Sequence, residues 1–367
     1  MLVRLLAALI ALAVLAPGVA AQDGTEVAPS RRLVLFVADG AGIAYWSAAV
    51  LEGHDLVIAE FPVVGLVDTR NLSGLEPESA SSATAFAIGE TSFPSAVGVG
   101  SDSQPRITVL EAAGTAGLGT GLATTTYVVD ATPAAFATHV SRRDSLLEIA
   151  RQLASSGVDV LLGDGAALFD PAVRPDGRDL IGELARTHTI VRSSDELAAA
   201  RRDPPERLVG FFDIDSIADP STREPSLTDM VRTALAVLDA YPKGFFLLVE
   251  NEHTDHRGHD NAPLATIVAE IVATDLAVRA ALEYREEHPE TLVVVVGDHE
   301  TGGLSLESAG DGYRARWATT GHTAELVPIF AVGPGAERFA GILTGAEVGR
   351  ALLASVRGAA TAERASD

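Results

Sequence analysis

The stretch Leu33-Val-Leu-Phe-Val-Ala-Asp-Gly40 decides the fold class expected for this chain. Six consecutive apolar residues followed by an acid and a glycine are typical of a parallel strand that is buried on both faces. In a sheet of such strands, ligands gather beyond the carboxyl ends. Asp39 therefore lies where a functional site is expected.

Further apolar runs alternate with helical patterns along the rest of the chain. Strands are predicted at residues 63–68, 117–123, 158–162, 244–249, 291–296 and 327–332, and helices at 80–88, 107–116, 145–155, 227–240, 262–287 and 345–357. Proline and charge are scattered from about residue 165 to 230, which we interpret as peripheral helices and loops. The alternation predicts an α/β fold, a three-layer αβα sandwich with a mostly parallel central sheet, formed by one domain over residues 32–357.

Both ends of the chain are expected to lie outside this domain. Residues 1–21 resemble a secretory signal peptide, since Arg4 precedes a short apolar run, Pro17-Gly18 interrupts it, and cleavage is expected near Ala21. We interpret 22–31 as a flexible leader and 358–367 as a disordered tail. The mature protein is thus expected to be exported, to the periplasm or the cell exterior, with no membrane span.

Composition narrows the range of partners. The 367 residues include 50 acidic and 27 basic side chains, for a formal net charge of −23. This balance argues against nucleic acid and anionic membranes as partners. An anionic substrate would need strong local positive charge from metal ions or from a well-placed arginine. Cysteine is absent, so stability must come from the core, bound metal or association rather than from disulfides.

The segment Glu78-Ser-Ala-Ser-Ser-Ala-Thr-Ala85 offers a candidate nucleophile. It follows a loop with glycine and proline and opens a predicted helix that stops at Gly89. A hydroxyl in the first turn of a helix lies among unpaired N–H groups, where an anion is stabilised. Ser79 is therefore placed to attack or hold a phosphate-like group. The alternative is that Ser79 only caps a small-residue helix packed against the sheet.

Acids and histidines elsewhere offer candidate metal ligands. Asp255 and His259 are four residues apart on one side of a helical turn, Asp298-His299 ends a predicted strand, and His322 lies in a Gly-flanked loop. Mixed carboxylate and imidazole ligands suit Zn²⁺, whereas hydroxyl and carboxylate alone suit Mg²⁺. Each residue taken singly has another interpretation, namely a helix cap, an ordinary loop histidine or a solvated polar loop. Their joint occurrence at predicted strand ends favours a metal centre.

Taken in order, these motifs resemble the alkaline phosphatase family over residues 33 to 335. The opening strand with its Asp-Gly pair and the segment 78–85 are similar to the family's first motif and nucleophile signature. Residues 130–143 resemble the segment that carries a magnesium-site threonine and a phosphate-binding arginine. Glu250, Asp255 and His259 match the next motif, and Asp298-His299 and His322 match the last two.

The resemblance implies hydrolysis of phosphate monoesters to an alcohol and inorganic phosphate, at alkaline pH, through a phosphoserine intermediate on Ser79. It implies two Zn²⁺ and one Mg²⁺, and a homodimer is one assembly it allows. Arg143 would grip the phosphate, and Asp130 and His256 would tune the third metal site, with His256 also contacting phosphate through water. The implied ligands are Asp255, His259 and His322 for one zinc; Asp39, Asp298, His299 and Ser79 for the other; and Asp39, Thr132 and Glu250 for magnesium.

Three departures from the family pattern stand out. Asp130 and His256 form a pairing at two positions that vary within the family, which leaves the preference of the third site for Mg²⁺ open. Glu78 replaces the usual aspartate before the nucleophile, which changes how Arg143 is oriented. Only about twenty residues separate His299 from His322, so the crown insertion of larger members is reduced. A more open site and a differently built dimer would follow.

Two other functions compete with this one. A phosphodiesterase or nucleotide pyrophosphatase of the same superfamily would share the zinc pair but usually lacks the third site and the arginine. A catalytically dead, exported metal- or phosphate-binding protein would need a missing ligand, and no expected ligand is missing. A sulfatase is disfavoured because the chain has no cysteine and Ser79 is not followed by the proline and arginine of that group.

Overall fold

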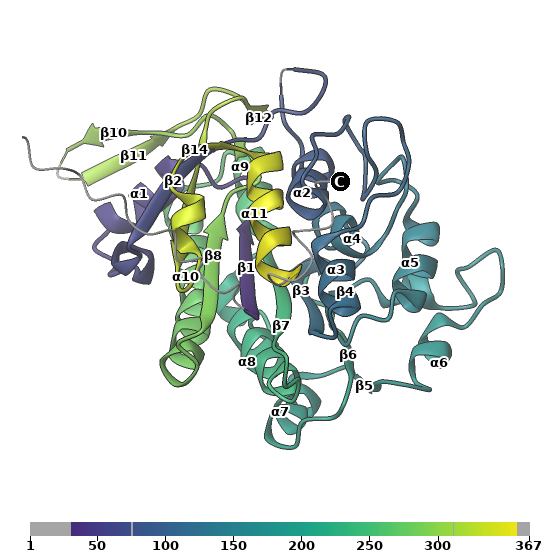
Figure 1. Ribbon diagram of the computed structural model, residues 1–367. Coiled ribbons are helices and arrows are strands. Elements are labelled where there is room, and N and C mark those ends of the chain that lie inside the picture. The colour runs from purple at the N-terminus through teal and green to yellow at the C-terminus, as the bar shows by residue number, and fades with distance from the viewer. Residues whose placement is uncertain (1–30, 75, 311, 358–367) are drawn as a thin grey trace, which may run out of the picture.

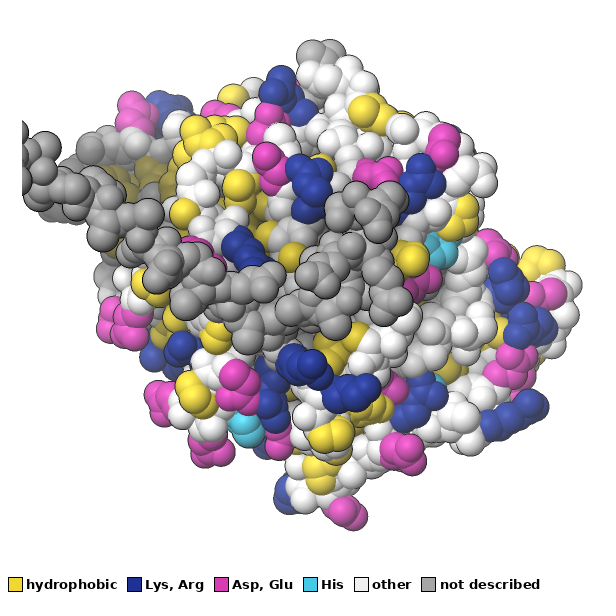
Figure 2. Space-filling model, viewed as in Figure 1, with side chains coloured by type: hydrophobic (Ala, Val, Ile, Leu, Met, Phe, Trp, Pro, Cys, Tyr) yellow, Lys and Arg dark blue, Asp and Glu magenta, His cyan; other side chains and the backbone are white. Residues whose placement is uncertain are grey.

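The computed structural model describes residues 31–74, 76–310 and 312–357. The predicted signal peptide, the leader except for its last residue, and the predicted tail lie outside the described residues. Acidic and basic side chains are interspersed on the face of the molecule shown in Figure 2. In the described part of the chain, no helix is both long enough and apolar enough to cross a membrane.

A ten-stranded sheet forms the middle of the molecule (Figure 1). Its order is β14-β2-β13-β8-β1-β7-β3-β4-β6-β5, and of these strands β13 alone runs antiparallel to its neighbours. The strands are β1 (Arg32–Ala38), β2 (Val63–Asp68), β3 (Gly119–Tyr127), β4 (Val160–Asp164), β5 (Thr189–Val191), β6 (Leu208–Phe211), β7 (Phe245–Asn251), β8 (Thr291–Val296), β13 (Val327–Val332) and β14 (Gly341–Thr344).

Helices cover both faces of this sheet. The side chains of β1 show why: Leu33, Leu35 and Val37 pack into one core, whereas Val34 and Phe36 pack into the other. The first core is covered by α2 (Ser79–Ile88), α3 (Val109–Thr115), α4 (Ala131–Ala137), α5 (Leu146–Ser155), α6 (Leu180–Leu184) and α11 (Gly345–Arg357). The second is covered by α1 (Ile43–Leu51), α7 (Ser194–Arg202), α8 (Leu227–Leu238) and α10 (Leu264–Glu287). The predicted three-layer αβα sandwich is confirmed.

The prediction for residues 165–230 was wrong in one respect. This region contributes β5 and β6 to the edge of the central sheet, in addition to helices and loops. The two strands have three and four residues, which is too short for a period-2 pattern to stand out among proline and charge. The edge strand β14 was missed for the same reason.

The topology places the ends of three central strands side by side. β1 lies between β7 and β8, and Val37 is in register with both Glu250 and Val296. Immediately beyond these ends lie Asp39, the short helix α9 (His253–His259) and the paired strands β9 (Glu300–Thr301) and β12 (His322–Thr323). Between β9 and β12 the described residues form the hairpin of β10 (Ser305–Ala309) and β11 (Gly312–Arg316), and this short segment is in keeping with the predicted reduced insertion.

Candidate active site

Ser79 opens α2 with its hydroxyl free of the capping role. The helix begins at Ser79, and the residue that caps it is Glu78, whose carboxylate accepts from Ala80 N at 3.1 Å and Ser81 N at 2.7 Å. The capping interpretation of Ser79 is therefore wrong. Its buried Oγ lies 3.1 Å from His299 Nε2. The candidate nucleophile thus faces a predicted metal ligand.

The second predicted zinc ligand set converges on the same point. His299 Nε2 lies 3.4 Å from Asp39 Oδ1 and 3.4 Å from Asp298 Oδ2. Asp298 Oδ1 is fixed by the N–H groups of Gly40 and His299, each at 3.0 Å. Two ligands of a tetrahedral zinc ion are separated by about 3.3 Å, given metal–ligand distances near 2.0–2.1 Å. The spacing of these three ligand atoms and of Ser79 Oγ fits such an ion.

Three buried carboxylate oxygens in this cluster make no hydrogen bond within the described residues. Among the described residues, both carboxylate oxygens of Asp39 and Oδ2 of Asp298 are buried and have no hydrogen-bond partner. Burial raises the pKa of Asp298 to about 7 and holds the pKa of Asp39 well above its usual range. Ionised carboxylates in such a place need a cation beside them. The residues therefore fit the metal that the sequence predicts.

The first predicted zinc ligand set is preorganised by backbone carbonyls. His322 Nδ1 donates to Pro77 O at 2.9 Å, and His259 Nδ1 donates to Thr320 O at 2.6 Å. Their Nε2 atoms then face each other at 3.2 Å, and His259 Nε2 lies 3.2 Å from Asp255 Oδ2. A donating Nδ1 leaves Nε2 as the lone-pair nitrogen, which is the tautomer that binds metal. This set also fits a zinc ion.

A third cluster contains oxygen ligands only. Carboxylate oxygens of Asp39, Glu250 and Glu252 lie within 4.8 Å of one another, and all three residues are buried. Thr124 Oγ1 donates to Glu250 Oε2 at 2.5 Å, whereas Glu250 Oε1 and the buried Thr132 Oγ1 have no hydrogen-bond partner within the described chain. Burial raises the pKa of Glu250 to about 8. An oxygen set of this kind suits Mg²⁺.

The glycine after Asp39 allows these clusters to approach one another. Gly40 has φ +68°, and a Cβ there would lie 2.7 Å from Thr301 Oγ1 and 2.8 Å from the Asp255 backbone. Thr301 in turn donates its hydroxyl to Asp255 Oδ1. Any larger residue at position 40 would push the first zinc ligand set away from β1.

Arg143 is held at the edge of the site by acids. Its Nη2 donates to Asp130 Oδ1 at 2.5 Å, and Nη1 lies 3.6 Å from Glu78 Oε2. Asp130 also caps α4, and the Arg143 N–H donates to Ser95 O at 2.9 Å. Glu78 reaches Arg143 only at the longer distance because its carboxylate also binds the start of α2. A guanidinium has five donors, so several remain for an oxyanion.

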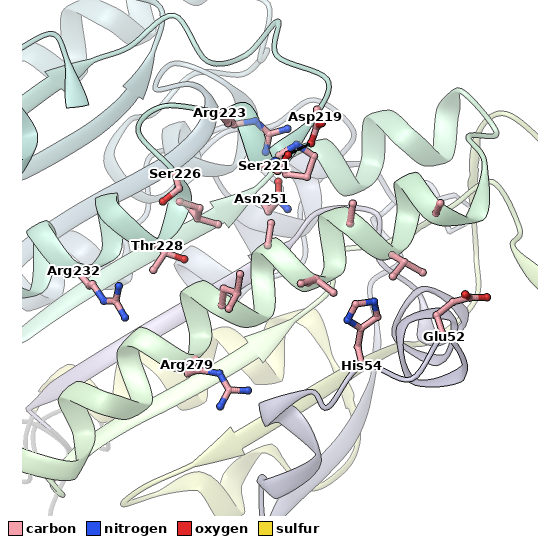
Figure 3. Close-up of a pocket in the computed structure, with 18 residues that line it drawn as sticks. Glu52, His54, Asp219, Ser221, Arg223, Ser226, Thr228, Arg232, Asn251 and Arg279 are labelled. Carbon is pink, nitrogen blue, oxygen red and sulfur yellow. Dashed lines mark hydrogen bonds between the residues drawn. The ribbon is translucent and has the colours of Figure 1, made fainter. Parts of the chain in front are cut away.

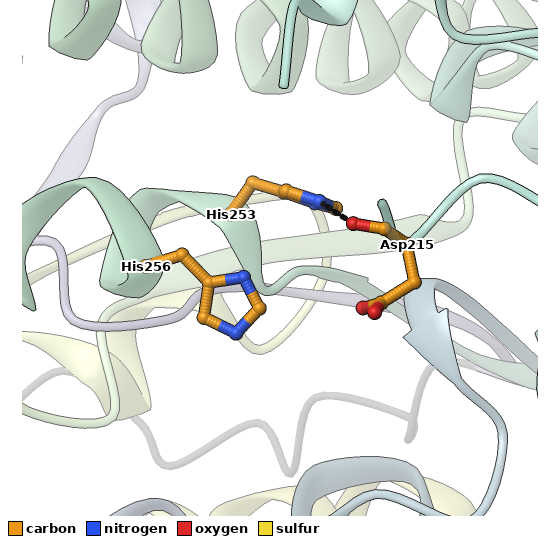
Figure 4. A group of neighbouring side chains, drawn as sticks. All are labelled: Asp215, His253 and His256. Atoms are coloured by element: carbon orange, nitrogen blue, oxygen red, sulfur yellow. Dashed lines mark hydrogen bonds between the residues drawn. The ribbon is translucent and has the colours of Figure 1, made fainter. Parts of the chain in front are cut away.

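Of the two extra histidines in this region, His253 is fixed by its neighbours. His253 Nε2 donates to Asp215 O at 2.8 Å (Figure 4), and Nδ1 lies 3.1 Å from Thr125 Oγ1. Burial lowers the pKa of His253 to about 3, so the ring is neutral. His256 is more exposed and faces Glu252, with Nε2 3.5 Å from Oε1. His253 is therefore structural, as expected, and the water-mediated phosphate contact of His256 stays a prediction.

A cavity of about 810 Å³ lies away from these clusters, against α10 (Figure 3). Alanine, valine and leucine side chains line it together with polar and charged ones, among them the buried Arg223 and also Arg232 and Arg279. Arg223 is already paired with Glu270 at 3.0 Å. No ligand residue of the three clusters lines this cavity. The candidate active site is therefore at the clusters of acids and histidines, and this cavity lies outside it.

Sequence reasoning placed the ligand sets together but missed three residues around them. Glu252 joins the third cluster, Thr124 supports Glu250, and Thr301 supports Asp255. The signal for Glu252 was present, because it follows Glu250 by two residues just after a strand. The threonines gave no signal, since their contacts depend on the sheet register.

Comparisons with known proteins agree with this geometry. The alkaline phosphatase family model matches residues 30–316. A repressible alkaline phosphatase of Saccharomyces cerevisiae is 35% identical over 314 residues, covering 75% of this chain and 55% of the yeast protein, so the chain spans about half of that relative. Streptomycin-6-phosphate phosphatase of Streptomyces griseus is 32% identical over 417 residues, covering 90% and 92%.

Solved structures show the same fold. The alkaline phosphatase of the Antarctic bacterium TAB5 superimposes with a TM-score of 0.83 at 28% identity, covering 90% of this chain and 98% of that one. The Thermus thermophilus alkaline phosphatase gives 0.79 at 25% identity, covering 92% and 94%. From the match of the family model, the level of identity to these relatives and the converging ligand sets, we conclude that the chain belongs to the alkaline phosphatase family of phosphomonoester hydrolases.

Proposed function

We propose that this chain hydrolyses phosphate monoesters by transient phosphorylation of Ser79, with two zinc ions and one magnesium ion as cofactors and an alkaline optimum. The observation that carries the proposal is the meeting of Ser79 Oγ, His299 Nε2 and the carboxylates of Asp39 and Asp298 at separations of 3.1–3.4 Å. A hydroxyl placed inside a metal ligand set is favoured for nucleophilic attack.

Each ion would be held by one of the clusters described above. Asp255, His259 and His322 would hold one zinc, and Asp39, Asp298 and His299 the other, with Ser79 completing its shell. Asp39, Thr132 and Glu250 would hold magnesium. Bound in this way, the ions would increase the acidity of the attacking hydroxyl and offset charge on the phosphoryl group. A TAB5 mutant structure has magnesium in its M3 site, which supports the choice for the third cluster.

In the first step a bond forms between Ser79 Oγ and phosphorus while the ester O–P bond breaks. Ser79 gives up its proton, and the departing alcohol takes one up. In the second step water adds to phosphorus, the Oγ–P bond breaks, and inorganic phosphate and free Ser79 result. Arg143 would bind two phosphoryl oxygens through both steps, since its ion pair with Asp130 fixes the plane of the guanidinium.

The phosphodiesterase alternative is disfavoured by two features of the described residues. The carboxylates of the third cluster lie together and Arg143 is held beside the site by Asp130, and phosphodiesterases of this superfamily usually lack both features. The expected result is fast turnover of a nitrophenyl phosphate and at most a slow turnover of its bis ester. Preference for the bis ester would favour the phosphodiesterase function.

Replacement of the nucleophile tests the proposal directly. Ser79→Ala is expected to lower kcat about a thousand-fold or more, because no oxygen remains to accept the phosphoryl group. The variant should keep two zinc ions per chain by elemental analysis, because three protein ligands remain at each zinc position. Ser82→Ala, a buried neighbour on the same helix, serves as the control and should remain active. Full activity of the Ser79→Ala variant would end this assignment.

Export and dimer formation are further proposals. The basic start and short apolar run of residues 1–21 support export to the periplasm or beyond, with cleavage near Ala21. Amino-terminal sequencing of secreted material would test this. A homodimer is the assembly that we propose from the family resemblance, and light scattering of the purified protein would distinguish one chain from two.

A further inference from the structure

Glu252 is a buried carboxylate outside the ligand sets that the sequence predicts. It comes directly after β7 and just before α9, and only 5% of the residue is exposed. Its N–H donates to Thr125 Oγ1 at 3.1 Å, which fixes the main chain at this point. A carboxylate oxygen of Glu252 lies within 4.8 Å of one from Asp39 and one from Glu250. The main chain therefore aims Glu252 into the third cluster.

Three carboxylates at this distance repel one another unless a cation lies among them. The neighbouring cationic side chain, Arg143, is already bound to Asp130 at 2.5 Å and lies 3.6 Å from Glu78. His256 Nε2 lies 3.5 Å from Glu252 Oε1, and the His256 side chain is partly exposed. The cluster thus has more negative charge than the surrounding side chains compensate.

A separate observation concerns hydrogen bonding at this point. Both oxygens of Asp39, Oε1 of Glu250 and Oγ1 of Thr132 are buried and make no hydrogen bond of ordinary geometry within the described residues. Asp39 and Glu250 are fully buried, and Thr132 is 1% exposed. Buried oxygens from three separate elements rarely remain unpaired, so they indicate an ion or water at their centre.

We propose that Glu252 is a fourth protein ligand of the third cation site, beside Asp39, Glu250 and Thr132, and that the ion is Mg²⁺. The inference rests on the proposed function only in taking this site as part of the same centre. Opposite ligands of an octahedral Mg²⁺ lie about 4.2 Å apart, which is compatible with the observed cluster. Four protein oxygens leave two positions for water.

A third carboxylate changes what the site selects. With Asp39, Glu250 and Glu252 ionised, the ligands carry three negative charges and no nitrogen, which favours a hard divalent cation over zinc. His256 Nε2 lies 3.5 Å from Glu252 Oε1, beside this carboxylate. The added charge strengthens Mg²⁺ binding beyond what two carboxylates provide.

Direct measurement of Mg²⁺ binding tests this inference. Zinc-loaded protein is titrated with MgCl₂ by calorimetry, for the unaltered chain and for Glu252→Gln, which keeps the shape and removes the charge. The expected result is a loss of Mg²⁺ affinity of tenfold or more, with two zinc ions per chain retained. Equal Mg²⁺ affinity, or loss of zinc together with magnesium, would overturn the proposal.

Two further variants keep the test decisive. Glu283→Gln alters an exposed glutamate paired with Arg232 and should bind Mg²⁺ as the unaltered chain does. Glu252→Asp keeps the charge on a shorter side chain and should bind with intermediate affinity, so it remains informative if Glu252→Gln folds poorly. An aspartate variant no better than the glutamine variant in a folded protein would also contradict the charge argument.

The outcome is separable from that of the proposed function. Calorimetry reports Mg²⁺ binding whether or not the protein turns over a phosphate ester. If the protein hydrolyses no phosphate ester but Glu252→Gln still binds Mg²⁺ at least tenfold more weakly than the unaltered chain, the proposed function alone would be overturned. If the protein hydrolyses phosphate esters but both forms bind Mg²⁺ with equal affinity, the role of Glu252 alone would be overturned.

Discussion

Glu78 shows how one side chain can serve two tasks at the residue scale. Its carboxylate accepts from Ser81 N at 2.7 Å and Ser95 N at 2.8 Å, and it lies 3.6 Å from Arg143 Nη1. The usual aspartate is shorter, so the glutamate here reaches the helix start and the arginine together. This arrangement leaves Ser79 Oγ free to face His299.

Arg143 and its neighbour Arg142 make a matched pair for mutation. Arg143→Lys is expected to lower kcat/KM by about 10- to 100-fold, because an ammonium cannot form two parallel bonds to a phosphoryl group. Arg142 pairs with Asp144 on the surface, and Arg142→Lys should leave kcat/KM within a factor of two. Steady-state kinetics with a nitrophenyl phosphate would measure both. Equal losses in the two variants would contradict the assignment of Arg143 as the phosphate-binding arginine.

At the scale of single elements, prediction succeeded where apolar runs were long. β1 and β8 were predicted within one residue, and their ends place Asp39 and Asp298 correctly. Prediction failed for β5 and β6, because three or four residues are too few to show a recognisable strand pattern of apolar residues. The start of α2 was also missed by one residue, because a glutamate cap is not a common helix signal.

The cap of α2 can be tested separately from the chemistry. Glu78→Ala is expected to reduce the free energy of unfolding by about 1–2 kcal/mol, since the N–H groups of Ala80, Ser81 and Ser95 lose their acceptor. Glu78→Gln keeps an acceptor oxygen and should recover about half of that loss. Denaturant unfolding with bound metal measures both changes. Identical stability of the alanine variant and the unaltered chain would show that the cap contributes nothing.

At the scale of the whole molecule, the site exists only because the sheet brings distant segments together. Asp39 and Asp298 follow β1 and β8, and Glu250 lies near the end of the adjacent strand β7. Ser79 opens α2, and Arg143 lies in the loop between α4 and α5. The sequence allowed these residues to be named through motif order and strand ends. Glu252, two residues after Glu250, could have been named from the same signal, whereas the contact of Thr301 with Asp255 depends on the three-dimensional packing and was not predictable.

Removal of metal should make folding stability depend strongly on pH. Burial raises the pKa of Glu250 from 4.5 to about 8 and that of Asp298 from 3.8 to about 7. In the metal-free chain the folded state then binds more protons than the unfolded state between these values, so stability falls as pH rises from about 5 to 8. We expect the melting temperature of chelated protein to drop by about 5 °C or more across this range.

The metal-loaded protein provides the control for that measurement. Added Zn²⁺ and Mg²⁺ should raise the melting temperature most at pH 8, because ionised ligands bind the cations best. Differential scanning calorimetry at pH 5.5 and 8 compares the two forms. A chelated protein that is equally stable at both values would show that these carboxylates are not repelled in the folded state.

Asp39 belongs to two of the ligand sets at once, and this sharing has a consequence for how the protein is prepared. When one ion leaves, the Asp39 carboxylate can turn fully towards the other ion. The loss of either ion therefore changes the affinity for the ion that is still bound. Samples stripped and refilled in different orders should therefore reach full occupancy at different speeds. The history of a preparation, and not only its final metal content, would then govern its behaviour at the bench.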